Sequence, residues 1–362
     1  MELRIATRDE VKEWEAFAAA HPEGRLYHSV AYFDTLIEWS HEYELLVARQ
    51  GGALVAGAVI HSRAVPGLGW RSANIEGGIL MKENTPEMLE ALYPSLIRHL
   101  DANSYVELRL HMRTPRQIEG SMVESSLPLD AMLKRFGARR EEKRFDEKTT
   151  GTYIVALGRD DAALLASFSR NCRRDVRKAE REGLMVEDSD DPSLLTTFYE
   201  QHVSTYRRKG LAVSLRGPFI RSSERALRSG LIRIYLARFA GNIVNMALVS
   251  RFGMPLFTRG ASIASTLDER VPPSGQFLHF EIMRRLRKDG FHHYDLGGSP
   301  GLEPVEGHPN YTVWRFKRGF GGDFHQDLGV YYAVLDRLKQ RVVSLARGVH
   351  EQFASLRVVM EG

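Results

Sequence analysis

The sequence predicts an α+β fold in which one arrangement of helices and strands is used twice. Two β-rich runs, at residues 45–60 and 235–249, match at an offset of 189 residues, and each has a turn near its middle. Further along, residues 96–100 and 282–286 match as helices at an offset of 186, and each leads into an expected strand. Two matches in the same order indicate one folding unit present twice, with chance similarity of two common hairpins as the alternative.

The first unit is expected to begin with two helices. In the pattern Thr7-x-x-Glu10, each side chain can bond the backbone N–H group of the other residue, so a helix is expected from there to near Gly24. A second helix is expected to start at Ser29 and to run through Trp39. These helices precede the first β-rich run.

The remaining elements follow from turn residues and from periodicity. The Gly51-Gly52 pair lies between two β-rich runs and predicts a hairpin. Strands are expected at residues 105–110 and 291–296, and a helix is expected from Ser274 to Gly290.

The repeat suggests where the domains lie. We expect one domain over residues 1–150 and a second over residues 151–320. We expect the segment 321–362 to pack back on the first domain, as a helix after Val330.

The order helix, helix, hairpin, helix, strand in each unit is similar to that of the GNAT acyltransferase fold, whose central sheet opens to admit an acyl donor. A GNAT enzyme that uses acetyl-CoA holds the pyrophosphate on backbone N–H groups before the helix that follows its central strand. In that position residues 269–275 include Pro272 and Pro273, which have no N–H group to donate. Residues 207–212 fit the phosphate-binding pattern, but they end a different helix. Acetyl-CoA is therefore not expected as the donor.

Composition excludes several classes of protein. The chain has 362 residues, a net charge of +4 and one cysteine, Cys172, so it can form no intramolecular disulfide and no cysteine metal cluster. No apolar stretch approaches the roughly 20 residues that span a bilayer, and the first residues do not form a signal peptide. We expect a cytoplasmic protein with no metal site and no cofactor, for which transient contact with a membrane surface is possible.

Residues 160–183 are expected to form one helix with an apolar side and a cationic side. Asp160 or Asp161 can cap its start, and Gly183 can end it. The apolar stripe consists of Leu165, Phe168, Cys172, Val176 and Ala179. The opposite stripe carries six cations, namely Arg170, Arg173, Arg174, Arg177, Lys178 and Arg181. Like charges so close repel each other, and a polyanion along them would release counterions, so phosphate binding is expected and an ordinary solvated face is the alternative.

Two glycine-containing segments near the C-terminus are candidates for the reaction centre. Asp295 lies at the end of an expected strand and is followed by Gly297 and Gly298, which allow a ligand to approach the backbone, although a bare turn needs glycines too. Residues 313–322 are expected to continue as a strand in which alternation places Phe316 on one face and Lys317 on the other. A fixed ammonium can stabilise the oxyanion that forms when an amine attacks an aminoacyl ester. A lysine that caps a strand or pairs with a carboxylate is the alternative.

Together these segments resemble the Fem family of aminoacyl-tRNA-dependent peptidyltransferases. The resemblance covers about residues 25–332, and four segments carry it: 169–183 (SRNCRRDVRKAEREG), 273–278, 294–298 (YDLGG) and 316–322 (FKRGFGG). It implies two tandem GNAT-like domains and transfer of an amino acid from tRNA to an amine. It also implies that Lys317 is the catalytic lysine, that Phe316 lies beside the acceptor stem and that the cationic helix lies near the tRNA.

The expected site therefore has three parts. The catalytic residues are Lys317 and Phe316, and the cationic helix binds the tRNA. The expected substrate-binding residues are Asp295, Gly297, Gly298, Arg207, Arg216 and Arg315. The donor, aminoacyl-tRNA, is a co-substrate, and the acceptor is an amine of a peptidoglycan precursor or of a small metabolite. The alternative is a GNAT-type N-acyltransferase with a CoA or carrier-protein donor, acting in polysaccharide modification, and a catalytically inactive module that binds anionic polymers is a third possibility.

The sequence departs from the Fem pattern at several points. Members that bind a UDP-linked precursor commonly have a lysine after the segment that corresponds to residues 29–32, and here Phe33, Asp34, Thr35 and Leu36 follow. His111-Met112 stands where the family often has an acidic residue and a proline. The long coiled-coil arm of some relatives is not expected, because residues 184–233 have no room for two long helices. These departures leave the acceptor open.

Overall fold

The computed structural model describes residues 1–36, 42–65, 68–141, 151–208, 213–262, 271–308 and 310–345. The first half of the chain contains the helices α1 (Arg8–Ala20), α2 (Val30–Thr35), α3 (Pro86–Ala102) and α4 (Leu127–Arg135). Its strands are β1 (Arg4–Ile5), β2 (Glu42–Gln50), β3 (Ala53–Val65), β4 (Trp70–Ile75), β5 (Leu80–Met81), β6 (Tyr105–Ile118), β7 (Ser121–Met122) and β8 (Arg139–Arg140). We call this set of elements unit one.

The second half repeats this arrangement and is called unit two. Its helices are α5 (Asp161–Ser167), α6 (Arg170–Arg181), α7 (Leu194–Arg208), α8 (Arg216–Arg228), α9 (Ser274–Lys288) and α10 (Tyr311–Arg318). Its strands are β9 (Gly151–Ala156), β10 (Met185–Ser189), β11 (Ile232–Phe239), β12 (Asn242–Ser250), β13 (Phe257–Ser262) and β14 (His293–Ser299). The last strand, β15 (Asp323–Val334), follows α10.

The two hairpins from which the repeat was predicted are both present. β2 and β3 pair antiparallel around Gly51 and Gly52, whose φ values are +57° and +83°. β11 and β12 pair in the same way around Ala240 and Gly241, whose φ values are +47° and +81°. Two consecutive residues with positive φ form the turn that matches the twist of the flanking strands. The expected capping box at Thr7 is also confirmed, and α1 ends at Ala20.

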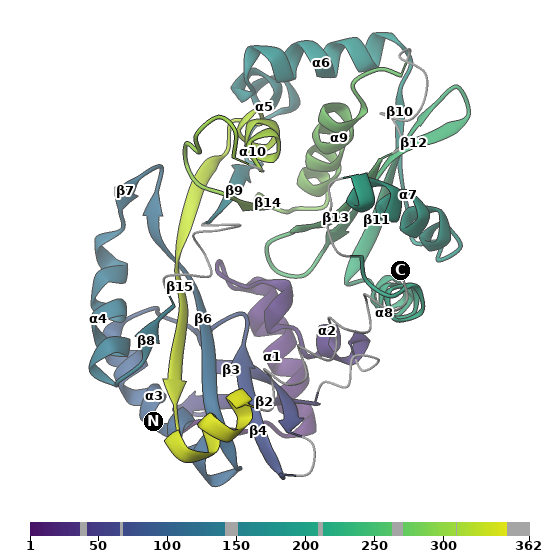
Figure 1. The fold of residues 1–362 in the computed structure, drawn as a ribbon. Coiled ribbons are helices and arrows are strands. Elements are labelled where there is room, and N and C mark those ends of the chain that lie inside the picture. Colours follow the sequence, from purple (N-terminus) through teal and green to yellow (C-terminus); the bar gives the residue numbers. More distant parts are fainter. Residues whose placement is uncertain are drawn as a thin grey trace.

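The strands form two sheets. The larger one has the order β1-β2-β3-β4-β6-β15-β9-β14, and the smaller has the order β10-β11-β12-β13. β9, which follows α4, pairs with β14 of unit two, whereas β15, which follows α10, pairs with β6 of unit one. The last strand of the chain, β15, therefore pairs with unit one, and it also pairs with β9 of unit two (Figure 1). In this way β15 joins the two units in one continuous sheet.

Three expectations about local structure were wrong. Residues 313–318 belong to helix α10 and not to a strand. Residues 160–183 form two helices, because Phe168 is extended and Ser169 caps the second helix. Residues 331–334 are part of strand β15, and helix begins only at residue 337. The expected domain boundary at residue 150 and the end of the second expected helix, at Trp39, lie outside the described residues.

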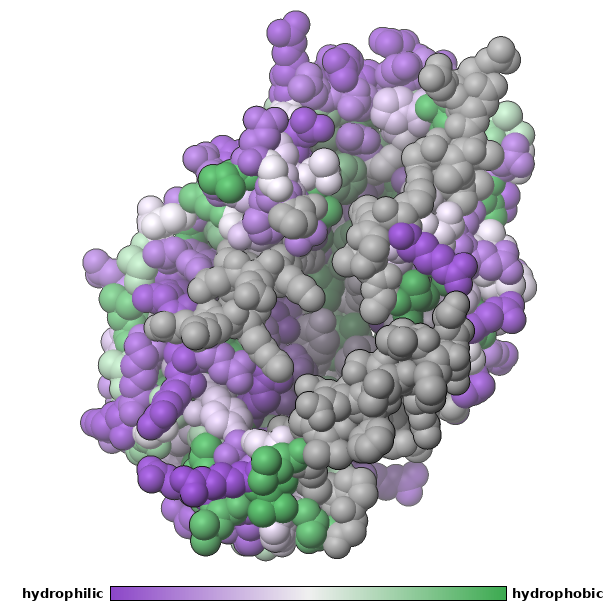
Figure 2. All heavy atoms as spheres, viewed as in Figure 1, coloured by the Kyte–Doolittle hydropathy of each residue, from purple (hydrophilic) through white to green (hydrophobic). Residues whose placement is uncertain are grey.

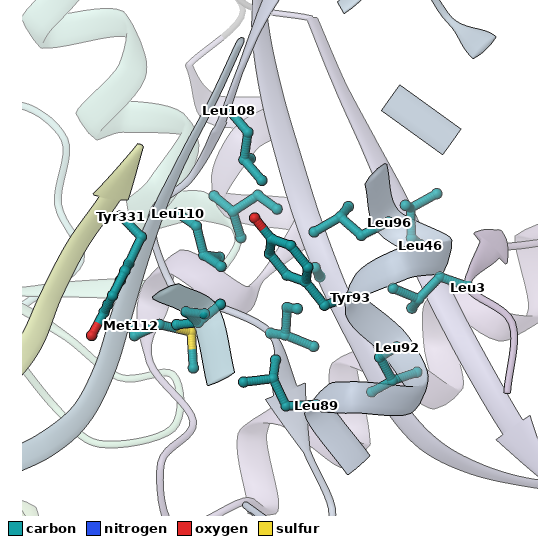
Figure 3. Packing of buried hydrophobic residues seen from close by; sticks show 14 of the residues in the cluster. Leu3, Leu46, Leu89, Leu92, Tyr93, Leu96, Leu108, Leu110, Met112 and Tyr331 are labelled. Atoms are coloured by element: carbon teal, nitrogen blue, oxygen red, sulfur yellow. The ribbon is translucent and has the colours of Figure 1, made fainter. Parts of the chain in front are cut away.

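The buried hydrophobic side chains gather in three clusters. In unit one, Leu89, Tyr93 and Leu96 of α3 gather with Leu108 of β6 and Tyr331 of β15 (Figure 3). A second cluster lies within unit two. The third contains side chains of both units, including Trp14 and Phe33 of unit one and Phe198 of unit two. An apolar interface therefore holds the two units together in addition to the shared sheet.

The sequence led us to expect neither a long coiled-coil arm nor a membrane-spanning helix. Within the described part of residues 184–233, α7 and α8 have 15 and 13 residues, and no long coiled coil is present. Among the residues that the structure describes, no helix is both long enough and apolar enough to cross a membrane.

Candidate functional site

Lys317 lies at the end of α10 with its side chain almost fully buried, since the residue is 7% exposed. Its Nζ donates a hydrogen bond to the carbonyl oxygen of Gly298, at 2.6 Å. In a helix, Phe316 and Lys317 point about 100° apart and not to opposite faces, as a strand would place them. Because these residues form a helix and not the expected strand, the lysine side chain points in another direction than predicted, but it still lies next to the glycine segment.

Gly297 must be a glycine for two reasons. Its φ is +76°, a backbone conformation that is strained for other residues. A Cβ atom here would lie 3.1 Å from the carbonyl oxygen of Phe257 and 3.5 Å from Nζ of Lys317. The glycine therefore keeps open the space directly beside the ammonium.

Asp295 holds this glycine segment in place. Its Oδ1 accepts the N–H of Gly297 at 2.7 Å and also the hydroxyl of Thr152 on β9. Its Oδ2 lies 3.3 Å from Nη1 of Arg25, which precedes α2 in unit one. The side chains of Arg25 and Asp295 are only 11% and 8% exposed. The sequence pointed to Asp295 as substrate-binding, and in the structure its carboxylate bonds to Gly297, Thr152 and Arg25. Arg25 was missed, because nothing in its local sequence marks a partner 270 residues away.

Aromatic side chains surround the lysine. The ring of His279 on α9 makes edge contacts with Phe257, Phe316 and Phe320, at centroid distances between 4.7 and 5.6 Å. Burial, and after it the charge of Lys317, lowers the pKa of His279 to about 3. The imidazole is therefore neutral at physiological pH, with its Nδ1 3.0 Å from the hydroxyl of Tyr294.

A cavity of about 310 Å³, which we call the interunit cavity, ends at Gly297 and Gly298. One wall comes from unit one and the other from α8, β12 and β13 of unit two. The side chains that line it include Tyr27, Tyr32, Leu36, Ser222, Phe257 and Arg259. The guanidinium of Arg259 lies over the ring of Phe219, 5.4 Å from its centroid. The sequence analysis missed Arg259, because the residue carries no motif and becomes a candidate only through the cavity.

A second cavity of about 470 Å³, which we call the α6–α10 cavity, is lined in part by Phe316. It is lined by residues of α6, α9 and α10, among them Asn171, Arg174, Gln276, Arg315 and Phe316. The ring of Phe316 packs on the first turn of α9, where a Cβ atom on Gly275 would lie 3.2 Å from it. Arg315, which the sequence analysis named as substrate-binding, is exposed and lines this cavity.

The cationic side of α6 borders this cavity. Phe168, Cys172, Val176 and Ala179 are buried, as the apolar stripe predicted. Burial raises the pKa of Cys172 to about 12, so it is a thiol within the core and not a nucleophile. A recess of about 560 Å³ is lined by Asn171 and by five arginines, namely Arg170, Arg173, Arg174, Arg177 and Arg181.

The six cations of α6 differ in what holds them. Arg173 donates to the carbonyl oxygens of Ala166 and Phe168, and Arg174 pairs with Asp175. Lys178 lies 3.8 Å from Glu182. Arg170, Arg177 and Arg181 form no ion pair with any described residue. Arg173, whose bonds go to backbone carbonyl oxygens, also forms no ion pair with a described residue, so these four arginines provide the cationic charge that no carboxylate neutralises.

Two expected substrate-binding residues are not part of this arrangement. Arg207, near the end of α7, and Arg216, at the start of α8, are exposed, and neither lines the interunit cavity or the α6–α10 cavity. Lys209, which follows α7, lies outside the described residues.

Unit one has a charged cluster at the end of β4. His111 lies 3.9 Å from Glu76 and 3.6 Å from Asp327, and Arg113 lies 3.5 Å from Asp327. The hydrogen bonds from His111 and His61 hold the pKa of Glu76 well below its usual range. His111 replaces the acidic residue of the Fem pattern, and the structure supplies carboxylates beside it from β15 and from the end of β4.

Comparisons with known proteins agree with this architecture. The chain matches the model of the FemAB family over residues 10–216 and that of an acetyltransferase (GNAT) domain over residues 166–318. Lipid II:glycine glycyltransferase of Staphylococcus aureus (strain USA300) is 22% identical, over 90% of this chain and 92% of that protein.

Solved structures show the same fold. The crystal structure of FemX superposes with a TM-score of 0.82 at 18% identity and covers 95% of this chain and 100% of that one. A tandem GNAT protein from the clavulanic acid biosynthesis pathway gives a TM-score of 0.50 at 15% identity, over 92% and 98% of the two chains. The chain is therefore an α+β protein with two tandem GNAT-like domains, as the repeat predicted.

Proposed function

The chain belongs to the FemAB family, and we propose that it is an acyltransferase that moves an amino acid from aminoacyl-tRNA to the amine of a peptidoglycan precursor. The similarity to a lipid II:glycine glycyltransferase supports this class of acceptor. An amine-bearing small metabolite is the second acceptor to be tested. The reaction would take place in the cytoplasm, where charged tRNA is available, and it needs no cofactor.

One observation carries the proposal. Phe316 lines the α6–α10 cavity, and the next residue, Lys317, bonds to Gly298, which lines the interunit cavity. The buried ammonium is therefore bonded to a residue that lines one cavity and belongs to the residue next to one that lines the other. A donor that arrives along the cationic helix and an acceptor held between the units can meet at Lys317.

The chemistry follows from this position. The neutral amine attacks the carbonyl carbon of the aminoacyl ester, and a C–N bond forms. The carbonyl oxygen of the ester becomes an oxyanion, which the ammonium of Lys317 stabilises. When the intermediate collapses, the C–O bond to the ribose breaks, and the ribose oxygen takes up the proton that the amine loses. The products are an amide and a free tRNA 3′ end.

His279 does not take part in this proton transfer. Because its pKa is about 3, the imidazole is uncharged at physiological pH and has no extra proton to donate. Its edge contacts with Phe257, Phe316 and Phe320 instead make the surroundings of Lys317 apolar. Lower polarity strengthens the attraction between the ammonium and an oxyanion.

The donor and the acceptor would be recognised by different groups of residues. Arg170, Arg177 and Arg181 would contact tRNA phosphates, as suits a cationic surface whose charges are not neutralised by neighbours. In the interunit cavity, Arg259 and Tyr27 would contact the acceptor, with the guanidinium placed for a carboxylate or a phosphate.

The proposal is tested by supplying one donor and one acceptor at a time. The purified chain is incubated with tRNA charged with single labelled amino acids, and with a UDP-linked precursor, a lipid-linked precursor or small amines. We expect transfer that depends on charged tRNA and stops after treatment with ribonuclease. Transfer from an acyl-CoA or an acyl carrier protein, with none from charged tRNA, would show that the alternative donor is correct.

A further inference from the structure

The helix at residues 337–345 exposes a row of hydrophobic side chains. Leu338, Val342 and Leu345 are 76%, 43% and 72% exposed, and their spacing places them on one face of the helix. Val343, on the opposite face, is buried, so the helix is attached to the protein through its other side. Four of the 13 exposed large hydrophobic side chains in the described chain lie within residues 334–345, which shows that they are not scattered singly.

Cations flank this row on both sides. Arg337 and Arg341 lie along one edge of the row and are exposed. Lys339 lies on the other side, where its Nζ pairs with Asp336, 3.1 Å from Oδ2, and lies 5.9 Å from the ring centroid of Trp70 at the start of β4. Leu68, two residues before Trp70, is 39% exposed.

This surface lies at one end of the molecule. Figure 1 shows the helix at residues 337–345 below the strands of unit one, whereas α6 lies at the opposite end of unit two. Figure 2 shows hydrophobic surface gathered at the lower end and hydrophilic surface over α6. A ligand on the C-terminal helix would therefore leave the cationic face of α6 accessible.

We propose that the face formed by Leu338, Val342 and Leu345, with Arg337 and Arg341, binds the surface of an anionic membrane. A row of leucine and valine flanked by arginine and lysine matches the apolar boundary and the negative headgroups of such a surface. A second copy of this chain would leave the flanking cations facing each other, which favours the membrane as the partner. The inference rests on the proposed function in one respect: membrane binding is useful to the reaction if the acceptor is anchored in lipid, because it brings the protein to that acceptor.

Sedimentation with vesicles tests the proposal directly. The full chain is mixed with vesicles of equimolar phosphatidylglycerol and phosphatidylcholine, or of phosphatidylcholine alone. We expect it to sediment with the anionic vesicles and to remain in solution with the neutral ones. The double variant Leu338→Glu/Leu345→Glu should bind at least about tenfold more weakly, because each leucine loses its apolar contact with the membrane. The variant Arg337→Gln/Arg341→Gln should lose about fivefold per cation.

A matched variant controls for a general effect of added negative charge. Met185 and Val305 are 67% and 77% exposed, and Met185→Glu/Val305→Glu should bind vesicles as the unaltered chain does. No binding by the unaltered chain, or equal binding by the leucine variant, overturns the proposal. A dimer that only the leucine variant dissociates, without vesicle binding, would identify the face as a contact between copies.

Turnover separates this proposal from the proposed function. The leucine variant should use a water-soluble acceptor at the normal rate and a vesicle-embedded acceptor more slowly. Absence of transfer to either acceptor by the unaltered chain contradicts the proposed function alone. Normal transfer to the vesicle-embedded acceptor by the leucine variant contradicts the membrane proposal alone.

Discussion

Arg25 of unit one and Asp295 of unit two form an ion pair across the interface of the two units, with Nη1 and Oδ2 3.3 Å apart. The same carboxylate accepts the N–H of Gly297 through its other oxygen, at 2.7 Å. The conformation of the glycine segment beside Lys317 is thus tied to the way in which the units pack. A site built in this manner depends on both units, although its catalytic candidate belongs to only one.

Removal of Arg25 should destabilise the protein strongly. In Arg25→Ala, Asp295 stays buried without its cation, and we expect a loss of about 3 kcal/mol in the free energy of unfolding. A double-mutant cycle with Asp295→Asn should give a coupling energy of about 1 kcal/mol or more, measured by urea denaturation. Arg228→Ala, which breaks a pair with Glu224 at a side chain that is 70% exposed, should cost no more than about 0.5 kcal/mol. Equal losses in the two arginine variants would refute a special role for Arg25.

Gly297→Ala should impair turnover more than stability alone explains. Gly290 is a suitable control, because its φ is +87° and a Cβ atom there would meet nothing within 4 Å. Both alanine variants should lose about 1–2 kcal/mol of stability from backbone strain. Only in Gly297→Ala does the new methyl group lie beside Lys317, so its kcat should fall about tenfold or more. Equal kcat values at a temperature where both variants are folded would count against this account.

The pH dependence of stability should reveal the buried His279. Its pKa in the folded chain is about 3, because burial and then the charge of Lys317 oppose protonation, whereas in the unfolded chain it is about 6.5. Below pH 6.5 the unfolded state binds a proton that the folded state does not, so this contribution is complete above pH 6.5 and declines as the pH falls. It amounts to about 2 kcal/mol between pH 8 and pH 5.

The variant His279→Gln should lose less stability over this range than the unaltered chain. Urea denaturation at pH 8 and at pH 5 measures, for each protein, how much the free energy of unfolding decreases. An identical decline in both proteins would mean that His279 does not remain neutral in the folded state.

The three arginines of α6 that have neither an ion pair nor a hydrogen bond to a described residue, Arg170, Arg177 and Arg181, should contribute strongly to RNA affinity. In Arg170→Gln/Arg177→Gln/Arg181→Gln, binding of tRNA should weaken, and the slope of log K against log salt should fall by about 0.7–0.9 for each phosphate contact that is lost. The variant Arg8→Gln/Arg135→Gln/Arg228→Gln removes the same charge from other surfaces and should bind nearly normally. A similar weakening in the two triple variants would indicate a general charge effect and no specific site.

Sequence patterns predicted the fold where they reflect local rules. The hairpins at Gly51 and at Gly241 were found because a turn with two positive φ values favours glycine. The start of α1 was found because the Thr7 box is a property of four consecutive residues. The return of the C-terminal segment to unit one was expected, but as a helix. Its pairing as strand β15 with β6 and with β9 was not found, since strand pairing at such separations depends on tertiary contacts that leave no mark in either strand.

The site was predicted only in part, for related reasons. Lys317 was identified from a resemblance, but its helix was taken for a strand because Val313, Trp314 and Phe316 are residues common in strands. The packing of Phe316 on α9 outweighs that preference. Arg25 and Arg259 stand near the site only after the chain has folded, so no spacing in the sequence could indicate them.

The most direct test of the central claim is the single-turnover rate of amide formation from preformed aminoacyl-tRNA. Lys317→Met removes the ammonium and keeps most of the side chain, so this rate should fall about 10²–10³-fold, as when an oxyanion-stabilising group is lost. The affinity for tRNA should stay close to that of the unaltered chain. Lys288→Met, at an exposed position near the end of α9, should react normally. A Lys317→Met protein that melts at a lower temperature but forms the amide at the normal rate would contradict the account.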